Sequence, residues 1–221
     1  MTIGKGTQTG IQASTRRAGT RRGLRNAAMA LGAAAMLSGC AALSLIGSES
    51  PPATFDLRAM PEGRFIGRAG GQLAIREPHA IQVLDNERIV FRPSPQLVTY
   101  YAGAQWADRL PLLVEQRLLA AFEHTTNLKT VSRTTDGLRV DFQLLTEIRD
   151  FGVTDETGGK VAEVRIYAKV IADDAGRALS GREFEGRVPV TGSGTDGAVG
   201  ALDTALSDVL TEIVRWTVGR I

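Results

Sequence analysis

The residue with the clearest capacity for covalent chemistry is Cys40, the only cysteine among the 221 residues of the chain. It ends the tetrapeptide Leu37-Ser38-Gly39-Cys40, in which an aliphatic residue and two small residues precede the thiol. Small residues let such a segment lie in the cleft of a signal peptidase, and a thiolate is a strong nucleophile for an acyl-glyceryl group. Cleavage before Cys40 would free an amine that can be acylated in turn.

The residues before Cys40 have the layout of an export signal. Residues 1–39 hold six basic residues and no acidic one, and 11 mainly apolar residues, Ala27 to Leu37, lead to the tetrapeptide. This order is typical of a secretory signal peptide. The tetrapeptide resembles the lipobox of bacterial lipoproteins, so we expect N-acyl and S-diacylglycerol chains on Cys40. The alternatives are an ordinary signal peptide that contains a cysteine, and a buried alanine-rich helix with a cysteine in the core.

The expected anchor is effectively permanent, because three acyl chains bury far more methylene groups than the single chain that binds a membrane reversibly. Ala41 follows the cysteine. Many Gram-negative bacteria retain lipoproteins with aspartate there in the inner membrane, so we expect outer-membrane anchoring on the periplasmic side. The inner-membrane periplasmic face is the alternative. Residues 20–25 also resemble a twin-arginine motif, although we interpret them as a generic basic segment, and both routes lead to the periplasm.

Charge and motifs argue against several function classes. Residues 40–221 hold 20 basic and 24 acidic residues, and this mildly acidic balance argues against nucleic-acid binding. A single cysteine excludes an internal disulfide framework and a cysteine-rich zinc site. The two histidines, His79 and His124, are not at ligand spacing from acidic residues. We therefore expect no metal and no cofactor besides the lipid on Cys40.

A glycine pattern and the lack of nucleophile motifs bear on enzyme activity. Residues 192–197 match G-x-G-x-x-G, but the chain lacks the second parallel strand that a dinucleotide site requires. We interpret them as a flexible strand-to-helix loop. The sequence shows no nucleophile elbow, Walker loop or paired histidine. We therefore expect a non-enzymatic protein, with a periplasmic hydrolase as the disfavoured alternative.

Hydrophobic periodicity predicts one domain after a tether. We divide the chain into a signal peptide at 1–39, a lipidated cysteine and flexible tether at 40–52, and a domain at 53–221. Period-two alternation predicts strands at 54–57, 72–76, 88–92, 97–101, 138–148, 161–171 and 183–190. Apolar residues at helical spacing predict helices at 109–124 and 196–220. The predicted fold class is α+β, a mainly antiparallel sheet with two amphipathic helices packed on one face, in a two-layer sandwich.

An aromatic cluster precedes the first predicted helix. Tyr100, Tyr101 and Trp106 lie within seven residues in a chain with only 5% aromatic residues. They either form a core cluster that ties the loop to the helix or provide a contact for a partner or a lipid. Together with the polar face of the sheet, they are our candidate contact surface.

Two segments of the chain carry a resemblance to a known family. Residues 88–95 and 100–111 resemble the ABC-type transport auxiliary lipoproteins, also called PqiC-like. In their signature, a strand ends near a tyrosine and a Trp-Ala-Asp/Glu block leads to a Leu-Pro pair that opens a helix. The matching residues are Tyr101, Trp106, Ala107, Asp108, Leu110 and Pro111. The family often begins its domain with a Tyr-x-Leu strand, whereas this chain has Phe55-Asp56-Leu57.

The resemblance implies a role in envelope lipid transport. Members accompany an ABC permease, its ATPase and a substrate-binding protein of the Mce or MlaD type. It therefore implies these partners and an auxiliary role in moving phospholipid or sterol-like lipids, and it leaves a homo-oligomer open. The alternative is an assembly or structural lipoprotein of another outer-membrane complex, such as the one that exports lipopolysaccharide.

Overall fold

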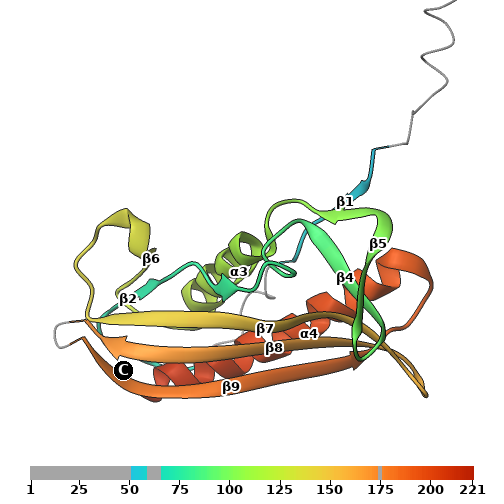
Figure 1. The fold of residues 1–221 in the computed structure, drawn as a ribbon. Coiled ribbons are helices and arrows are strands. Elements are labelled where there is room, and N and C mark those ends of the chain that lie inside the picture. The colour runs from blue at the N-terminus through green and yellow to red at the C-terminus, as the bar shows by residue number, and fades with distance from the viewer. Residues whose placement is uncertain (1–50, 59–65, 174–175) are drawn as a thin grey trace, which may run out of the picture. The chain divides into compact units, whose positions relative to one another are not determined.

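The computed structural model describes residues 51–58, 66–173 and 176–221. The lipobox residues Leu37, Ser38, Gly39 and Cys40 lie outside this part of the chain, so lipidation stays a prediction. The described residues form one 9-stranded sheet, two long helices and a short 3₁₀ helix at Thr134–Asp136 (Figure 1). The strands are β1 (Ala53–Phe55), β2 (Gln72–Ile75), β3 (His79–Ala80), β4 (Arg88–Ser94), β5 (Leu97–Trp106), β6 (Thr130–Arg133), β7 (Phe142–Glu156), β8 (Gly159–Ala172) and β9 (Arg177–Pro189).

The strands β7, β8 and β9 form the antiparallel meander that the alternation predicts. The predicted inward face of β8 is fully buried, each side chain being 0% exposed: Ala162, Val164, Ile166, Ala168 and Val170. Alternate residues of a strand share one face, so this run supplies a continuous apolar surface for a second layer. The polar residues between these positions face away from the helices.

The sheet as a whole is mixed rather than mainly antiparallel. On its other edge β7 pairs in parallel with β2, β3 and β4, and β5 pairs in parallel with β1. Parallel neighbours need a crossover connection, and the chain between β4 and β7 supplies one through β5, α3 (Leu110–Thr125) and β6. Alternation gives the face of a strand but not its direction, which is why the sequence missed these pairings.

Both helices form the predicted second layer. The helix α4 (Gly194–Val218) packs on β8 and β9, and α3 contacts α4, β2 and β6. Figure 1 shows α4 running along one face of the β7–β9 meander. Gly186 on β9 lets α4 approach the sheet closely, because the Cβ atom of any other residue there would lie 2.6 Å from the carbonyl oxygen of Ala205 on α4. The α+β class and the packing of both helices on one face are therefore confirmed.

The strand that we placed at 138–148 differs from prediction at both ends. It begins at Phe142, and Leu138, the first residue of the predicted strand, is 54% exposed. The strand also continues beyond Ile148 to Glu156 through a bulge between Ile148 and Asp150. The extra residue shifts the alternation, and Phe151 becomes the next core residue.

Candidate functional site

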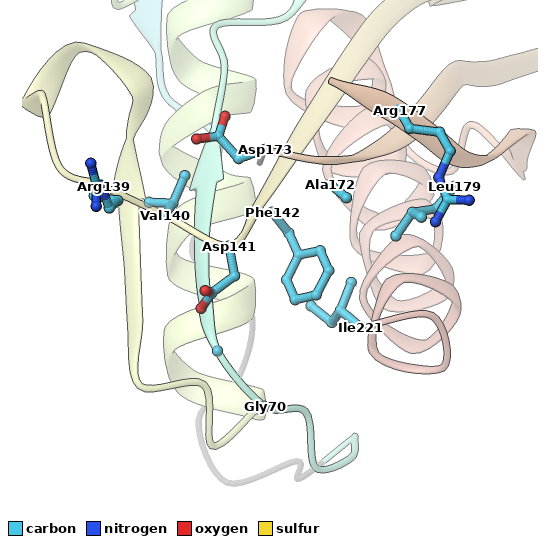
Figure 2. Close-up of a pocket in the computed structure, with 11 residues that line it drawn as sticks. Gly70, Arg139, Val140, Asp141, Phe142, Ala172, Asp173, Arg177, Leu179 and Ile221 are labelled. Atoms are coloured by element: carbon cyan, nitrogen blue, oxygen red, sulfur yellow. The ribbon is translucent and has the colours of Figure 1, made fainter. Parts of the chain in front are cut away.

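A cavity lies where β7 begins, β8 ends and β9 begins. Its volume is about 960 Å³. Figure 2 shows the side chains that surround it, and Figure 1 places the C-terminus at this end of the sheet. The lining residues are Gly70, Gly71, Arg139, Val140, Asp141, Phe142, Ala172, Asp173, Arg177, Leu179 and Ile221. Charged and apolar residues thus meet in one depression that opens to solvent.

Two carboxylates hold one wall of this cavity in place. Asp141 accepts a hydrogen bond from the Gln72 N–H at its Oδ2 atom (2.8 Å), and its own N–H donates to the Gln72 carbonyl (3.0 Å). Asp173 donates its N–H to the Asp141 carbonyl (3.0 Å) and accepts a hydrogen bond from the Gln143 side chain. Gly71 has a φ of 91°, and a Cβ there would lie 2.7 Å from Asp141 Oδ2. Both acidic residues therefore hold the wall of the cavity together through their hydrogen bonds.

The apolar part of the lining continues the core of the domain. Phe142, Leu179 and Ile221 are half-buried and pack against the core from β7, β9 and the C-terminal end of the chain. Val140, only 9% exposed, lies beside them in the lining. The partly exposed side chains of Phe142, Leu179 and Ile221 therefore form an apolar surface within the cavity, which we call its floor.

Two arginines flank this floor. Arg139 and Arg177 are exposed, and in Figure 2 they stand on opposite sides of Phe142. Neither forms a salt bridge with any residue that the structure describes. By contrast, six other arginines of the described sheet are ion-paired, namely Arg92, Arg133, Arg149, Arg165, Arg182 and Arg187. The cavity thus combines an apolar floor with two guanidinium groups that lack a protein carboxylate partner in the described structure.

The predicted aromatic residues lie elsewhere, on β5. Tyr100 is half-buried under the guanidinium of Arg88, whose Cζ atom is 4.9 Å from the ring centroid. It lines a second groove of about 640 Å³, together with Pro52 and the start of α3 at Arg109. Arg109 pairs with Asp85 and with Glu77 (3.1 Å), and its bond to Asp85 raises the pKa of its guanidinium. Tyr100 therefore faces a charged, solvent-open groove beside the point where the chain enters the domain.

Tyr101 and Trp106 are more enclosed. The ring centroids of Tyr101 and Phe91 lie 5.5 Å apart, and the Tyr101 hydroxyl has no hydrogen-bond partner among the described residues. Burial raises the pKa of this hydroxyl, and the negative charge of Asp155 raises it further. Trp106 is 1% exposed and packs edge-on against Phe151, with 5.9 Å between ring centroids. Of the three aromatic side chains, only Tyr100 has the guanidinium of an exposed arginine over its ring in the described structure, whereas Trp106 occupies a core position, as the first of our two interpretations of the cluster predicts.

The remaining sequence candidates show no assembled catalytic site. His79 and His124 are both exposed, and no three His, Cys, Asp or Glu residues of the described part gather closely enough to hold a metal ion. In the glycine-rich loop, a Cβ at Gly197 would lie 2.6 Å from the Thr191 carbonyl oxygen, so this glycine serves a tight turn into α4. Neither described helix has a long enough apolar stretch to span a membrane.

No sequence pattern predicted the cavity. Its lining residues come from five separate segments of the chain, and no regular spacing links the two arginines. Asp173 follows the strand predicted at 161–171, and an acidic residue at a strand end by itself indicates no more than a solvated turn. Only tertiary folding brings these segments together, so no local sequence pattern could have predicted the cavity.

Comparison with known proteins identifies the family. The sequence profile of the ABC-type transport auxiliary lipoprotein component family matches residues 55–214. The chain belongs to this family. The resemblance drawn from Tyr101, Trp106 and the Leu-Pro pair is therefore confirmed.

The chain is also similar in sequence or structure to other proteins. A protein of Bradyrhizobium diazoefficiens is 30% identical over 184 residues, which is 83% of this chain and 49% of that protein. The chain thus spans about half the length of this relative. The crystal structure of protein XCC0632 from Xanthomonas campestris is similar with a TM-score of 0.68 and 25% identity, covering 76% of this chain and 95% of that one. A second crystal structure, 14% identical with a TM-score of 0.60 over 76% of this chain and 99% of that one, shares the fold.

Proposed function

We propose that this auxiliary lipoprotein is a non-enzymatic, periplasm-facing subunit of a Mce-type ABC transporter that moves lipids across the cell envelope. The observation that carries the proposal is the family match, which spans residues 55–214 and so almost the whole predicted domain. The described site fits a binding role, because it offers grooves and cavities rather than a nucleophile next to a base.

The proposed anchor explains how one small domain serves a large machine. Three acyl chains on Cys40 would hold the protein at the outer membrane, and residues 41–52 would give the domain reach. The permease and its ATPase would lie in the inner membrane, with a Mce or MlaD-type protein between them and this subunit. In this arrangement the auxiliary domain acts as a docking point on the outer-membrane side.

The groove beside Tyr100 is our proposed contact for the Mce-type partner. It lies next to Pro52, where the tether joins the domain, and it presents an aromatic ring and the guanidinium of Arg88 to solvent. Tyrosine and arginine dominate the binding energy of many protein interfaces. Replacement of Tyr100 by alanine should therefore weaken partner binding without removing a core side chain.

Pull-down of the full-length, tagged lipoprotein from solubilised membranes tests the proposal. We expect to recover a Mce-type protein, a permease and an ATPase, and at least fivefold less of them with Tyr100→Ala. Leu138→Ala, which truncates an exposed side chain elsewhere, serves as the matched control and should recover wild-type amounts. Recovery of lipopolysaccharide-export proteins instead would favour the alternative role and overturn the transporter assignment.

A further inference from the structure

We propose that the cavity at the start of β9 binds a phosphate-bearing acyl lipid, with its phosphate at Arg177 and an acyl chain over Phe142, Leu179 and Ile221. The inference rests on the proposed lipid transport and narrows its substrate, because it selects a glycerophospholipid over a sterol-like lipid. It also places a lipid site on the auxiliary domain itself.

The size and floor of the cavity fit an acyl chain. Its volume of about 960 Å³ lies within the range of roughly 300–1,000 Å³ that is usual for small-molecule sites. The three half-buried floor residues come from β7, β9 and the C-terminal segment that follows α4, so the apolar surface extends across several elements. A hydrocarbon chain bound over this surface would shield both the chain and the apolar floor from water, which favours binding.

The position of Arg177 joins the floor to a charge. Arg177 and Leu179 both line the cavity from the start of β9, where a β-bulge falls between Ala178 and Ser180. In Figure 2 both side chains lie on the β9 side of the cavity, beside the apolar floor. An amphiphile whose chain covers Leu179 would therefore bring its headgroup to Arg177.

The charges of the lining select a phosphate. Asp141 and Asp173 already accept hydrogen bonds from Gln72 and Gln143 within the wall. Arg139 and Arg177 form no salt bridge with any described residue, unlike six arginines on the strands of the sheet. The planar guanidinium fork matches phosphate oxygens. A sterol offers only a hydroxyl group and would leave both arginines without an anion.

Site-specific crosslinking in cells tests this site on the full chain. A photoreactive benzoylphenylalanine replaces Leu179, the cells are labelled with [³²P]phosphate, and the lipoprotein is purified after irradiation. We expect radioactive lipid on the protein. The same residue at Ile81, which is 59% exposed and outside the cavity, should give no label. Label of equal strength at both positions, or a crosslinked protein at position 179 without label, would contradict the proposal.

Charge variants test the headgroup contact. Arg177→Glu should reduce the label at position 179 at least fivefold, and Arg139→Glu should reduce it less. Arg76→Glu replaces an exposed arginine outside the cavity and is the matched control. Unchanged label in Arg177→Glu would contradict the assignment of the phosphate to Arg177. Equal unfolding temperatures of the three variants would show that each is folded. Excess cholesterol added before irradiation should not reduce the label at position 179, whereas a reduction would favour a sterol site.

The pull-down separates this inference from the proposed function. Recovery of the Mce-type partner with no label at position 179 would reject the lipid site and leave the transporter role intact. Label at position 179 with no transporter partner would support the site and reject the transporter role.

Discussion

The buried guanidinium of Arg117 on α3 lies 3.4 Å from the Asp203 carboxylate on α4. The same carboxylate oxygen accepts a hydrogen bond from the backbone N–H of Arg58 at 2.8 Å, and Arg117 also donates to the Ser207 hydroxyl at 2.7 Å. Arg117 is only 3% exposed, and burial lowers its pKa. One carboxylate thus joins both helices and fixes the chain where it leaves β1.

Asp203→Ala should strongly destabilise the domain, because it leaves the buried charge of Arg117 without its partner. Removing one member of a buried ion pair costs about 3–5 kcal/mol, and this loss should appear as a lower free energy of unfolding in urea. Asp208→Ala, on the exposed side of the same helix, is the control and should change stability little. Equal unfolding curves for the two variants would show that the pair contributes no stability.

Gly152→Ala tests a second close approach, on the polar face of the sheet. Arg92 pairs with Asp150 at 2.8 Å, and a Cβ at Gly152 would lie 2.8 Å from Arg92 Nη1 and 2.9 Å from Val90 Cγ1. The methyl group should displace Arg92 and cost about 1–3 kcal/mol through overpacking, measured by chemical denaturation. At Gly158 a Cβ meets no atom within 4 Å, so Gly158→Ala should be nearly neutral. A neutral Gly152→Ala would mean that Arg92 moves aside freely.

Local patterns predicted the parts of the fold that depend on local chemistry. The inward residues of β8 and the apolar stripe of α4 repeat at regular spacing, so both elements and their buried faces could be identified. The bulge after Ile148 breaks this regularity. Because an inserted residue is invisible to a simple alternation, the strand's second half was missed.

The parts that depend on distant contacts were not predictable in the same way. The parallel pairing of β4 with β7 joins residues about 60 positions apart, such as Val90 and Gly152, and no neighbouring residue encodes it. The same holds for the meeting of Arg177 and Ile221 at the cavity. The family motif around Trp106 could be identified because it is contiguous, yet its tryptophan turned out to be a core residue.

Cys40→Ser should abolish lipidation and leave an unprocessed precursor, because a hydroxyl is a much weaker nucleophile than a thiolate for the acyl-glyceryl group. Growth with labelled palmitate, followed by gel electrophoresis, measures both properties at once. Ser38→Ala keeps a small residue before the cleavage site and should retain label and processing. Normal processing of Cys40→Ser would refute the lipobox interpretation and favour an ordinary signal peptide.

Glu115→Gln should change how stability depends on pH. Glu115 on α3 is 6% exposed and accepts a hydrogen bond from Arg133 Nε at 3.3 Å. Burial raises its pKa above the ordinary 4.5 despite the lowering effect of Arg133. The folded state therefore holds the Glu115 proton more tightly than the unfolded chain does. The resulting stabilisation is complete below the unfolded pKa and is lost as the pH rises through the folded one.

Glutamine stays neutral at every pH, so the variant should lack this loss of stability. We expect its free energy of unfolding to rise relative to wild type as the pH increases from about 4 to about 7, measured by urea denaturation at several pH values. Glu123→Gln changes an exposed carboxylate on the same helix and should follow the wild-type profile. Parallel profiles for Glu115→Gln and wild type would show that Arg133 compensates fully for the burial of Glu115.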